Sequence, residues 1–312
     1  MAAYDPLSLA NSNKLGTRTF LSESKQPRVE YEAVATAMTM VQTVEYEKRR
    51  AMEINNSKRW KDIPKSEKTK EEKRRASSDE FVYRNYIKSK EVGNFLYPPA
   101  IQAELNKPSI NTLKNATRFD TGYKDGRSSD VATDFDKSTK SPGGQHSNGW
   151  MSPDILTTLD KHGPKLTNML NMILTSIDNG QKSVVFTKYR NHYGLNLIST
   201  LLRYLNVPHI VLSGEVTQAN RITMITTFNG SNGIVLLSNV DLPGDLINVS
   251  NIHFFEGTDT TNVVKYVNHV SKFLSTVPLV TVTFHIAQKA DGTDAADMIS
   301  YKRIVDTFKV VT

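Results

Sequence analysis

Short apolar runs alternate with longer amphipathic segments throughout the second half of the chain. The runs, rich in Val, Ile, Leu and Phe, are residues 183–187, 209–213, 233–238, 252–256 and 279–287. The segments with helical spacing of apolar residues are 153–161, 165–177, 194–205, 217–229, 263–274 and 296–308. Buried strands that alternate with helices of about a dozen residues are typical of βαβ units and a mostly parallel sheet. We therefore expect residues 151–312 to form one α/β lobe of about five strands.

The first half of the chain is more polar. Residues 1–28 are mixed in composition and have the character of a tail. Residues 29–52 (VEYEAVATAMTMVQTVEYEKRRAM) predict a helix with one buried face, because their apolar residues recur at helical spacing. The apolar positions on that face are Val34, Met38, Val41 and Val44.

A basic segment and a polar linker follow this predicted helix. Between Lys48 and Lys90 the chain has 15 Lys or Arg against 7 Asp or Glu. Such a segment is either a solvated helix with internal ion pairs or a basic arm for nucleic acid or an acidic partner. Residues 120–150 are rich in Gly, Ser, Asp and Thr, and they cannot bury enough surface to fold alone. We therefore expect a helical or extended basic region at 1–119, a linker at 120–150 and the lobe at 151–312.

Composition excludes several classes of protein. The 312 residues include no cysteine, which rules out disulfides, cysteine-type zinc sites and thiol nucleophiles. Seven histidines are scattered without metal-ligand spacing, so we expect neither a metal nor a cofactor. The chain has no apolar stretch of roughly 20 residues and no secretory signal pattern, so we expect a soluble protein without a membrane span. A net charge of +7 is compatible with a polyanionic partner, although solubility alone can explain it.

The order of the segments in the lobe resembles a known family. The stretches SVVFTKYRNHYGLNLISTLL, VLSGEVTQANRITMITTFN and GIVLLSNVDLPGDLINVSNIHFFEG are similar to the C-terminal lobe of superfamily 2 helicases. They look closest to the chromatin-remodeller-like branch of large cytoplasmic DNA viruses, which includes poxviral nucleoside triphosphate phosphohydrolase I and the helicase subunit of the early transcription factor. Upstream, EVGNFLYPPAI (91–101) resembles the Asn-Phe-x-x-Pro segment that precedes this lobe. The resemblance covers residues 80–312 and implies a single RecA-like lobe.

Polar and basic residues follow the first three predicted strands. Ligands of open α/β sheets bind at the carboxyl ends of the strands, and the resemblance implies that a nucleic-acid backbone runs along this edge. A glycine after the second strand would let a backbone amide approach a phosphate, with a serine hydroxyl beside it. The alternative is that these side chains only cap strand ends. The candidate nucleic-acid-binding residues are Lys188, Arg190, His192, Ser213, Gly214 and Ser238.

The sequence departs from the family where a motor needs its chemistry. No G-x-x-x-x-G-K-[ST] phosphate-binding loop occurs, and Asp79-Glu80 follows no apolar strand, so we expect the first lobe of a helicase motor to be missing. The family's last motif, Gln-x-x-Gly-Arg-x-x-Arg, aligns with residues 266–273, yet no arginine lies between Arg221 and Arg303. Arginines of that motif stabilise charge on the transferring phosphate. We therefore expect no nucleotide hydrolysis by this chain alone.

Three functional hypotheses remain. The first is a non-catalytic helicase-like module of a large DNA virus that binds nucleic acid or proteins of the transcription or virion machinery, in the virion and the host cytoplasm. The second is a structural, minor virion or capsid-associated component that uses the lobe as a scaffold. The third is one half of a two-chain ATPase, which the absent arginines disfavour because a partner would also have to replace them.

Overall fold

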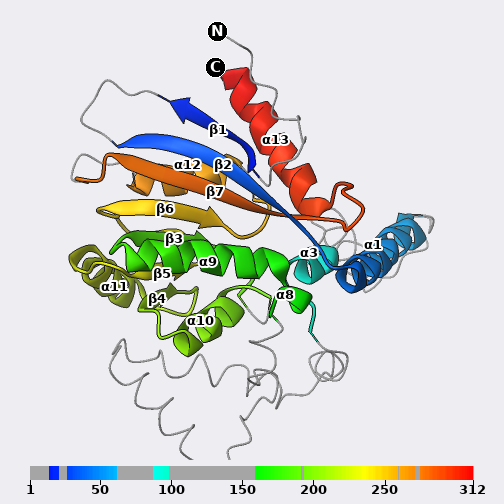
Figure 1. Ribbon diagram of the computed structural model, residues 1–312, viewed down its shortest axis with the longest axis horizontal. Coiled ribbons are helices and arrows are strands. Elements are labelled where there is room, and N and C mark those ends of the chain that lie inside the picture. Colours follow the sequence, from blue (N-terminus) through cyan, green and yellow to red (C-terminus); the bar gives the residue numbers. More distant parts are fainter. Residues whose placement is uncertain are drawn as a thin grey trace, which may run out of the picture.

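A seven-stranded sheet lies at the centre of the computed structural model (Figure 1), with the strand order β1-β2-β7-β6-β3-β5-β4. The structure describes residues 14–20, 27–61, 87–97, 159–190, 193–258, 260–270 and 275–311. The strands are β1 (Lys14–Phe20), β2 (Arg28–Ala37), β3 (Lys182–Phe186), β4 (His209–Leu212), β5 (Val235–Ser238), β6 (Val249–Phe254) and β7 (Leu279–Gln288). The helices are α1 (Met40–Lys61), α3 (Ile87–Asn94), α8 (Leu159–His162), α9 (Pro164–Asp178), α10 (Leu195–Tyr204), α11 (Gln218–Gly230), α12 (Thr260–Val270) and α13 (Ala296–Val311).

Six strands, β2 to β7, run parallel to one another, and β1 pairs with β2 in the antiparallel direction. All five predicted strands of the lobe are present at β3 to β7. The predicted α/β class with a mostly parallel sheet is therefore confirmed. The expected linker at 120–150 lies outside the described residues.

The prediction of a helix over residues 29–52 is wrong in its first part. Residues 28–37 form β2, which pairs with β7 in unbroken register from Arg28 opposite Leu279 to Ala37 opposite Gln288. The segment RVEYEAVATA includes Val, Tyr and Thr, which favour strands, and pairing with a neighbouring strand overrides a spacing that also suits a helix. Part of the expected tail is also a strand, because residues 14–20 form β1. The sheet therefore recruits two strands from the N-terminal region.

The helix begins only at Met40, at a reciprocal cap. The Thr39 hydroxyl accepts a hydrogen bond from the Gln42 amide at 3.2 Å, and the Gln42 side chain accepts one from the Thr39 amide at 3.3 Å. This Thr-x-x-Gln arrangement is a capping box, which satisfies two amides at a helix start. It separates β2 from α1 within three residues.

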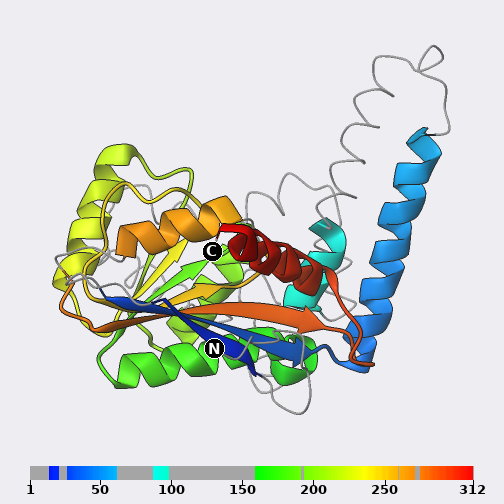
Figure 2. The same ribbon diagram turned by 90° about the horizontal axis from the view of Figure 1, so that it is seen from above.

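Helices cover both faces of the sheet (Figure 2), and their apolar side chains form one core layer on each face. Helices α11, α12 and α13 pack on one face, and α9 and α10 pack on the other. Phe95 and Tyr97, which follow α3, are buried in the second layer and attach the N-terminal region to the lobe. Helix α1 projects away from the lobe near the end of β2. Among the described residues, no helix is long and apolar enough to span a bilayer.

Candidate nucleic-acid interface

The carboxyl ends of β3, β5 and β4 lie side by side at one edge of the sheet. Phe186 pairs with Ser238, which in turn pairs with Leu212, so the three strands end in the same row. The Thr187 amide extends this row by donating a hydrogen bond to the Ser238 carbonyl at 3.1 Å. The predicted site residues that are described by the structure therefore share one edge.

Their exposure divides these residues into two groups. Lys188 and Gly214 are exposed, and Arg190 is half-buried, with its guanidinium 2.6 Å from a carboxylate oxygen of Glu215. Ser213 and Ser238 are buried. The remaining candidate is His192, which lies outside the described residues. The exposed cation at this edge that sequence reasoning identified is thus Lys188.

The two buried serines take part in turns of the protein itself. The Ser238 hydroxyl donates to the Val240 carbonyl at 2.8 Å and accepts from the Val240 amide at 3.2 Å. Arg221 donates from Nε to the Val216 carbonyl at 2.9 Å and from Nη2 to the Ser213 carbonyl at 3.1 Å. The residues after β5 and β4 are therefore fixed by internal hydrogen bonds. The Ser238 hydroxyl thus does what the alternative interpretation expected, because it caps the end of its own strand.

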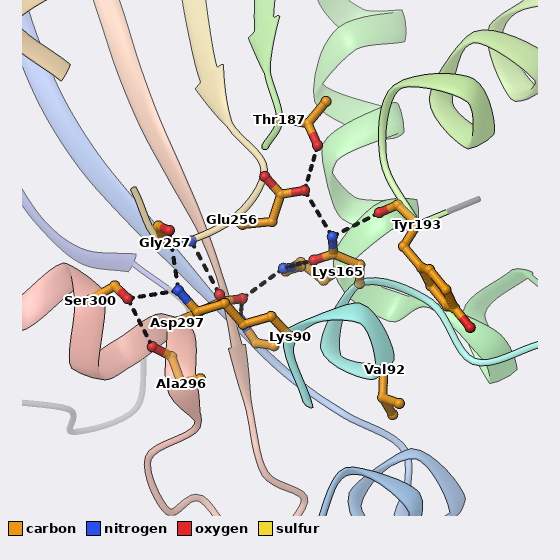
Figure 3. Close-up of polar contacts among 12 residues, drawn as sticks. Lys90, Val92, Lys165, Thr187, Tyr193, Glu256, Gly257, Ala296, Asp297 and Ser300 are labelled. Carbon is orange, nitrogen blue, oxygen red and sulfur yellow. Dashed lines mark hydrogen bonds and ion pairs between the residues drawn. The ribbon is translucent and has the colours of Figure 1, made fainter. Parts of the chain in front are cut away.

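The turn after β3 is held by a carboxylate that the sequence analysis did not single out. Glu256 follows β6, is only 2% exposed, and lies beside the end of β3. Its oxygens accept hydrogen bonds from the Thr187 hydroxyl at 2.5 Å and from the Lys188 amide at 2.9 Å. Figure 3 shows the carboxylate of Glu256 facing Thr187. The backbone that carries Lys188 is thereby bonded to the neighbouring strand end.

A glycine makes the turn compact. A Cβ atom at Gly194 would lie 2.1 Å from the Tyr189 carbonyl oxygen and 2.5 Å from Thr187 Oγ1. The chain entering α10 consequently touches the backbone of the turn, and the Leu195 amide donates to the Tyr189 carbonyl at 2.8 Å. A side chain at residue 194 would push the two segments apart.

A buried charged cluster continues from Glu256 into the N-terminal region. Asn94 of α3 donates to Glu256 Oε1 at 2.8 Å and accepts from Lys165 Nζ at 2.6 Å. Lys165 also pairs with Asp297 of α13 at 2.7 Å. Lys90 donates to the Ser300 hydroxyl at 2.9 Å (Figure 3). Two lysines and two carboxylates therefore balance one another beneath the strand ends.

Burial and the opposite charges act on the pKa values of this cluster in different ways. Burial raises the pKa of Glu256, against the opposing influence of Lys165 and of the hydrogen-bond donors. Burial alone would raise the pKa of Asp297 as well, but the cations of Lys165 and Lys90 bring that pKa below its usual value. Asp297 is thus the direct counter-ion of the lysines. The direct hydrogen-bond donors to Glu256 are neutral groups, and Lys165 acts on it through Asn94 and through its charge.

Sequence reasoning found the edge but not the residues beneath it. The Asn-Phe-x-x-Pro resemblance did mark the segment that contains Asn94, although it assigned no role to that side chain. Glu256 closes the apolar run 252–256, and a charged residue at that place was the available signal. Lys165 and Asp297 lie in helices, where a lone charge is usually solvated. Phe228 is fully buried in the core.

The cluster does not resemble a metal centre. Within the described ranges, no group of three or more His, Cys, Asp or Glu residues could hold a metal ion. The cations that face the two carboxylates are lysine side chains of the protein. The cluster therefore acts as an internal framework under the exposed turn.

The fold is similar to that of solved structures, although sequence comparison finds no relative. No protein-family model matches the sequence, and no curated protein matches it significantly. The C-terminal part of the Fun30 ATPase domain superposes with a TM-score of 0.53 and 14% identity, covering 90% of this chain and 97% of that chain. The Sulfolobus solfataricus SWI2/SNF2 ATPase core in complex with dsDNA gives a TM-score of 0.46 and 13% identity, with 83% of this chain and 41% of that chain covered. The likeness to the Fun30 domain shows the fold alone: the chain is an α/β RecA-like lobe like the C-terminal part of that ATPase domain.

Proposed function

We propose that this chain is a helicase-like module that binds a nucleic-acid backbone along the carboxyl edge of β3, β5 and β4. The observation that carries the proposal is the exposed Lys188, presented at the end of a parallel strand on a turn that a buried carboxylate fixes. A lysine at such an edge can neutralise a phosphate and release counterions. Arg190 adds a second cation, which Glu215 now pairs and a phosphate could take over.

We further propose that the module does not hydrolyse nucleotide by itself. The chain has no phosphate-binding loop sequence, and no arginine lies between Arg221 and Arg303. On α12, where the arginine motif would begin, Lys265 lies 3.3 Å from Asp241, and His269 lies 3.4 Å from Asp245. Those side chains face acidic neighbours, and neither offers the planar fork of an arginine. The viral setting, with transcription or virion proteins as partners, rests on the sequence resemblance and belongs to the same proposal.

Fluorescence polarisation with single- and double-stranded DNA and RNA across a salt series tests the binding. For Lys188→Ala we expect several-fold weaker binding and a salt slope reduced by about one phosphate contact. Arg203→Ala is the matched control, because it removes a positive charge at the other end of α10, next to the start of β4. Equal effects of the two variants, or no binding by the parent protein, would contradict the proposal.

A specific observation favours a structural role as the second candidate. Apolar residues of α1 are exposed to solvent, a feature typical of protein–protein interaction sites. These residues are Met40, Val41, Val44 and Met52. Light scattering of the parent and of the double variant Val41→Ser/Val44→Ser tests this role. Larger species that only the parent forms would favour a scaffold over a nucleic-acid module.

A further inference from the structure

We propose that Glu256 is the positioning residue for Lys188, and that the α3 segment is thereby part of the nucleic-acid site. The inference rests on the proposed function and deepens it. Glu256, Thr187 and Asn94, here called the clamp, hold the turn 187–190 in one conformation before any ligand arrives. A phosphate backbone then meets a lysine whose main chain is already ordered.

The clamp uses both oxygens of one carboxylate. Oε1 of Glu256 accepts from the Thr187 hydroxyl at 2.5 Å and from the Asn94 amide group at 2.8 Å. Oε2 accepts from the Lys188 backbone amide at 2.9 Å. The three donors come from two elements, α3 and the end of β3, and they meet on a residue that follows β6. A carboxylate is suited to this task because it accepts several hydrogen bonds and donates none.

The same hydrogen bonds close the turn on itself. The Tyr189 amide donates to Thr187 Oγ1 at 3.2 Å, so the hydroxyl that binds Glu256 also orders the next residue. The Tyr189 carbonyl is bonded to the Leu195 amide, and Gly194 allows that close approach. Ordering the backbone in advance lowers the entropy lost on binding. Loss of the clamp should therefore weaken binding without removing a single contact to the ligand.

Burying a charged residue at this position costs free energy, so the carboxylate needs a structural explanation. Glu256 is buried, and burying a carboxylate requires compensation by hydrogen bonds and nearby cations. A neutral side chain could end β6 without that penalty. The carboxylate accepts three hydrogen bonds, from a hydroxyl, a backbone amide and a side-chain amide of two separate segments. A neutral side chain has fewer acceptor sites for them.

The N-terminal region enters through Asn94. Its amide group donates to the Tyr193 carbonyl at 2.8 Å as well as to Glu256, and its oxygen accepts from Lys165. Lys165 is anchored by Asp297, which fixes the direction in which the asparagine points. Asn94 thus contacts the residues just before α10 as well as the carboxylate that holds the turn.

The sharpest test compares two threonines of the full chain. Thr187→Val removes the hydroxyl that donates to buried Glu256, and Thr283→Val removes the hydroxyl that donates to buried Glu32 at 3.0 Å, within the sheet rather than at its edge. Both threonines are fully buried, so the two variants make the same change of shape and each leaves a carboxylate short of one donor. We expect Thr187→Val to weaken nucleic-acid binding roughly three- to tenfold, and Thr283→Val to leave affinity unchanged.

A double-mutant cycle then asks whether the effect passes through Lys188. If the clamp positions this lysine, Thr187→Val weakens the parent but adds little to Lys188→Ala, and both lower the salt slope. An equal loss in the two backgrounds, an equal loss for Thr283→Val, or no loss for Thr187→Val would overturn the inference. Each of these outcomes leaves the proposed function intact as long as Lys188→Ala weakens binding.

Hydrogen exchange provides a measurement that needs no ligand. The Lys188 amide should exchange slowly in the parent and faster in Glu256→Gln, because an amide side chain has only one acceptor oxygen for three donors. Unchanged exchange would overturn the inference even if Lys188→Ala weakens binding. Exchange of the Lys188 amide could rise in Glu256→Gln while the parent binds no nucleic acid. The clamp would then order the turn but serve no nucleic-acid site. The proposed function then fails, and the positioning role falls with it.

Discussion

Helices α9 and α1 are both attached to the same sheet, but they bury opposite kinds of residue. Helix α9 buries an apolar stripe against the sheet, formed by Leu166, Met169, Leu170 and Ile173. Helix α1 buries a mainly polar face, formed by Gln42, Thr43, Tyr46 and Glu53. Its apolar face points to solvent, with Val41 70% and Val44 61% exposed. The difference teaches that helical periodicity identifies which residues share a face, whereas the tertiary structure decides which face is covered.

The two helices are therefore held by different forces. Apolar burial on α9 is non-directional and adds up over the layer. Apart from Tyr46, which packs in a small apolar cluster, α1 is held by individual hydrogen bonds. Examples are Gln42 Nε2 to the Val92 carbonyl and the Ser89 hydroxyl to Glu53, both at 2.9 Å. A neutral bond of this kind contributes only about 0.5–1.5 kcal/mol net, and one to a carboxylate about 1.5–3 kcal/mol. We expect α1 to open locally well before the lobe unfolds.

The largest expected effect on stability comes from removing a buried aromatic ring from the lobe. Phe228→Ala empties the fully buried site of a ring in the layer of α11, α12 and α13, and should destabilise the protein by about 3–5 kcal/mol. Chemical denaturation followed by circular dichroism measures this. Thr226→Ala, on the exposed side of the same helix, is the control and should change stability by less than about 0.5 kcal/mol. A small effect at Phe228 would mean that the lobe lacks the cooperative core ascribed to it.

The second-largest effect is expected on acidification, which should lower the stability of the lobe but not the free energy of opening of α1. His253 and His285 are buried together on β6 and β7, 3.1 Å apart, and burial lowers the pKa of His253 to about 4 from 6.5. Between these values the unfolded chain binds a proton that the folded chain refuses, so stability is lost as pH falls below about 6.5. For His253 alone the loss at pH 5 is roughly 2 kcal/mol.

Urea titrations at pH 7 and pH 5 measure this loss, and His253→Gln should reduce it, with the remainder due to His209 and His285, whose pKa values burial also lowers. Residues 40–61 contain no histidine, so local opening of α1 should not share the pH dependence. A profile in His253→Gln as steep as in the parent would contradict the assignment to this pair.

Strands such as β3 and β5 could be predicted because they are short, mainly apolar runs that are buried on both faces. Strand β2 could not, because its alternating Glu and apolar residues are ambiguous until β7 pairs with them, some 250 residues later in the chain. No local pattern carries information about that pairing.

The candidate site likewise contains residues that could be predicted from the sequence and residues that could not. Lys188 was predicted because it follows an apolar strand, and the general rule for parallel sheets places ligands at that edge. Glu256 and Asn94 were missed because their roles depend on three segments meeting, which spacing within one segment does not encode. The hydroxyl of Ser238 was predicted at the right edge, but its partner is its own turn. A strand-end position alone does not distinguish a capping hydroxyl from a ligand-binding one.

A smaller effect is expected where α1 meets α3. Gln42→Ala removes the hydrogen bond to the Val92 carbonyl and half of the capping box, and should lower the free energy of opening of α1 by about 1 kcal/mol. Hydrogen exchange of the α1 amides measures this directly, while global denaturation should change less. Lys48→Ala, on an exposed residue of the same helix that pairs with Glu45 of that helix, is the control. If global stability falls as much as the local protection of α1, then α1 and the lobe form one cooperative unit.

The smallest expected effect is on the exposed apolar face. Val44→Ser should change the free energy of unfolding of the isolated chain by less than about 0.5 kcal/mol, because the side chain is 61% exposed and loses little burial. Ile173→Ser on α9 is the matched apolar-to-polar change at a fully buried site, and should cost several times more. Thermal denaturation of the two variants beside the parent compares them. A loss above 1 kcal/mol for Val44→Ser would show that this face is covered in solution, and α1 would then be held by apolar burial like α9.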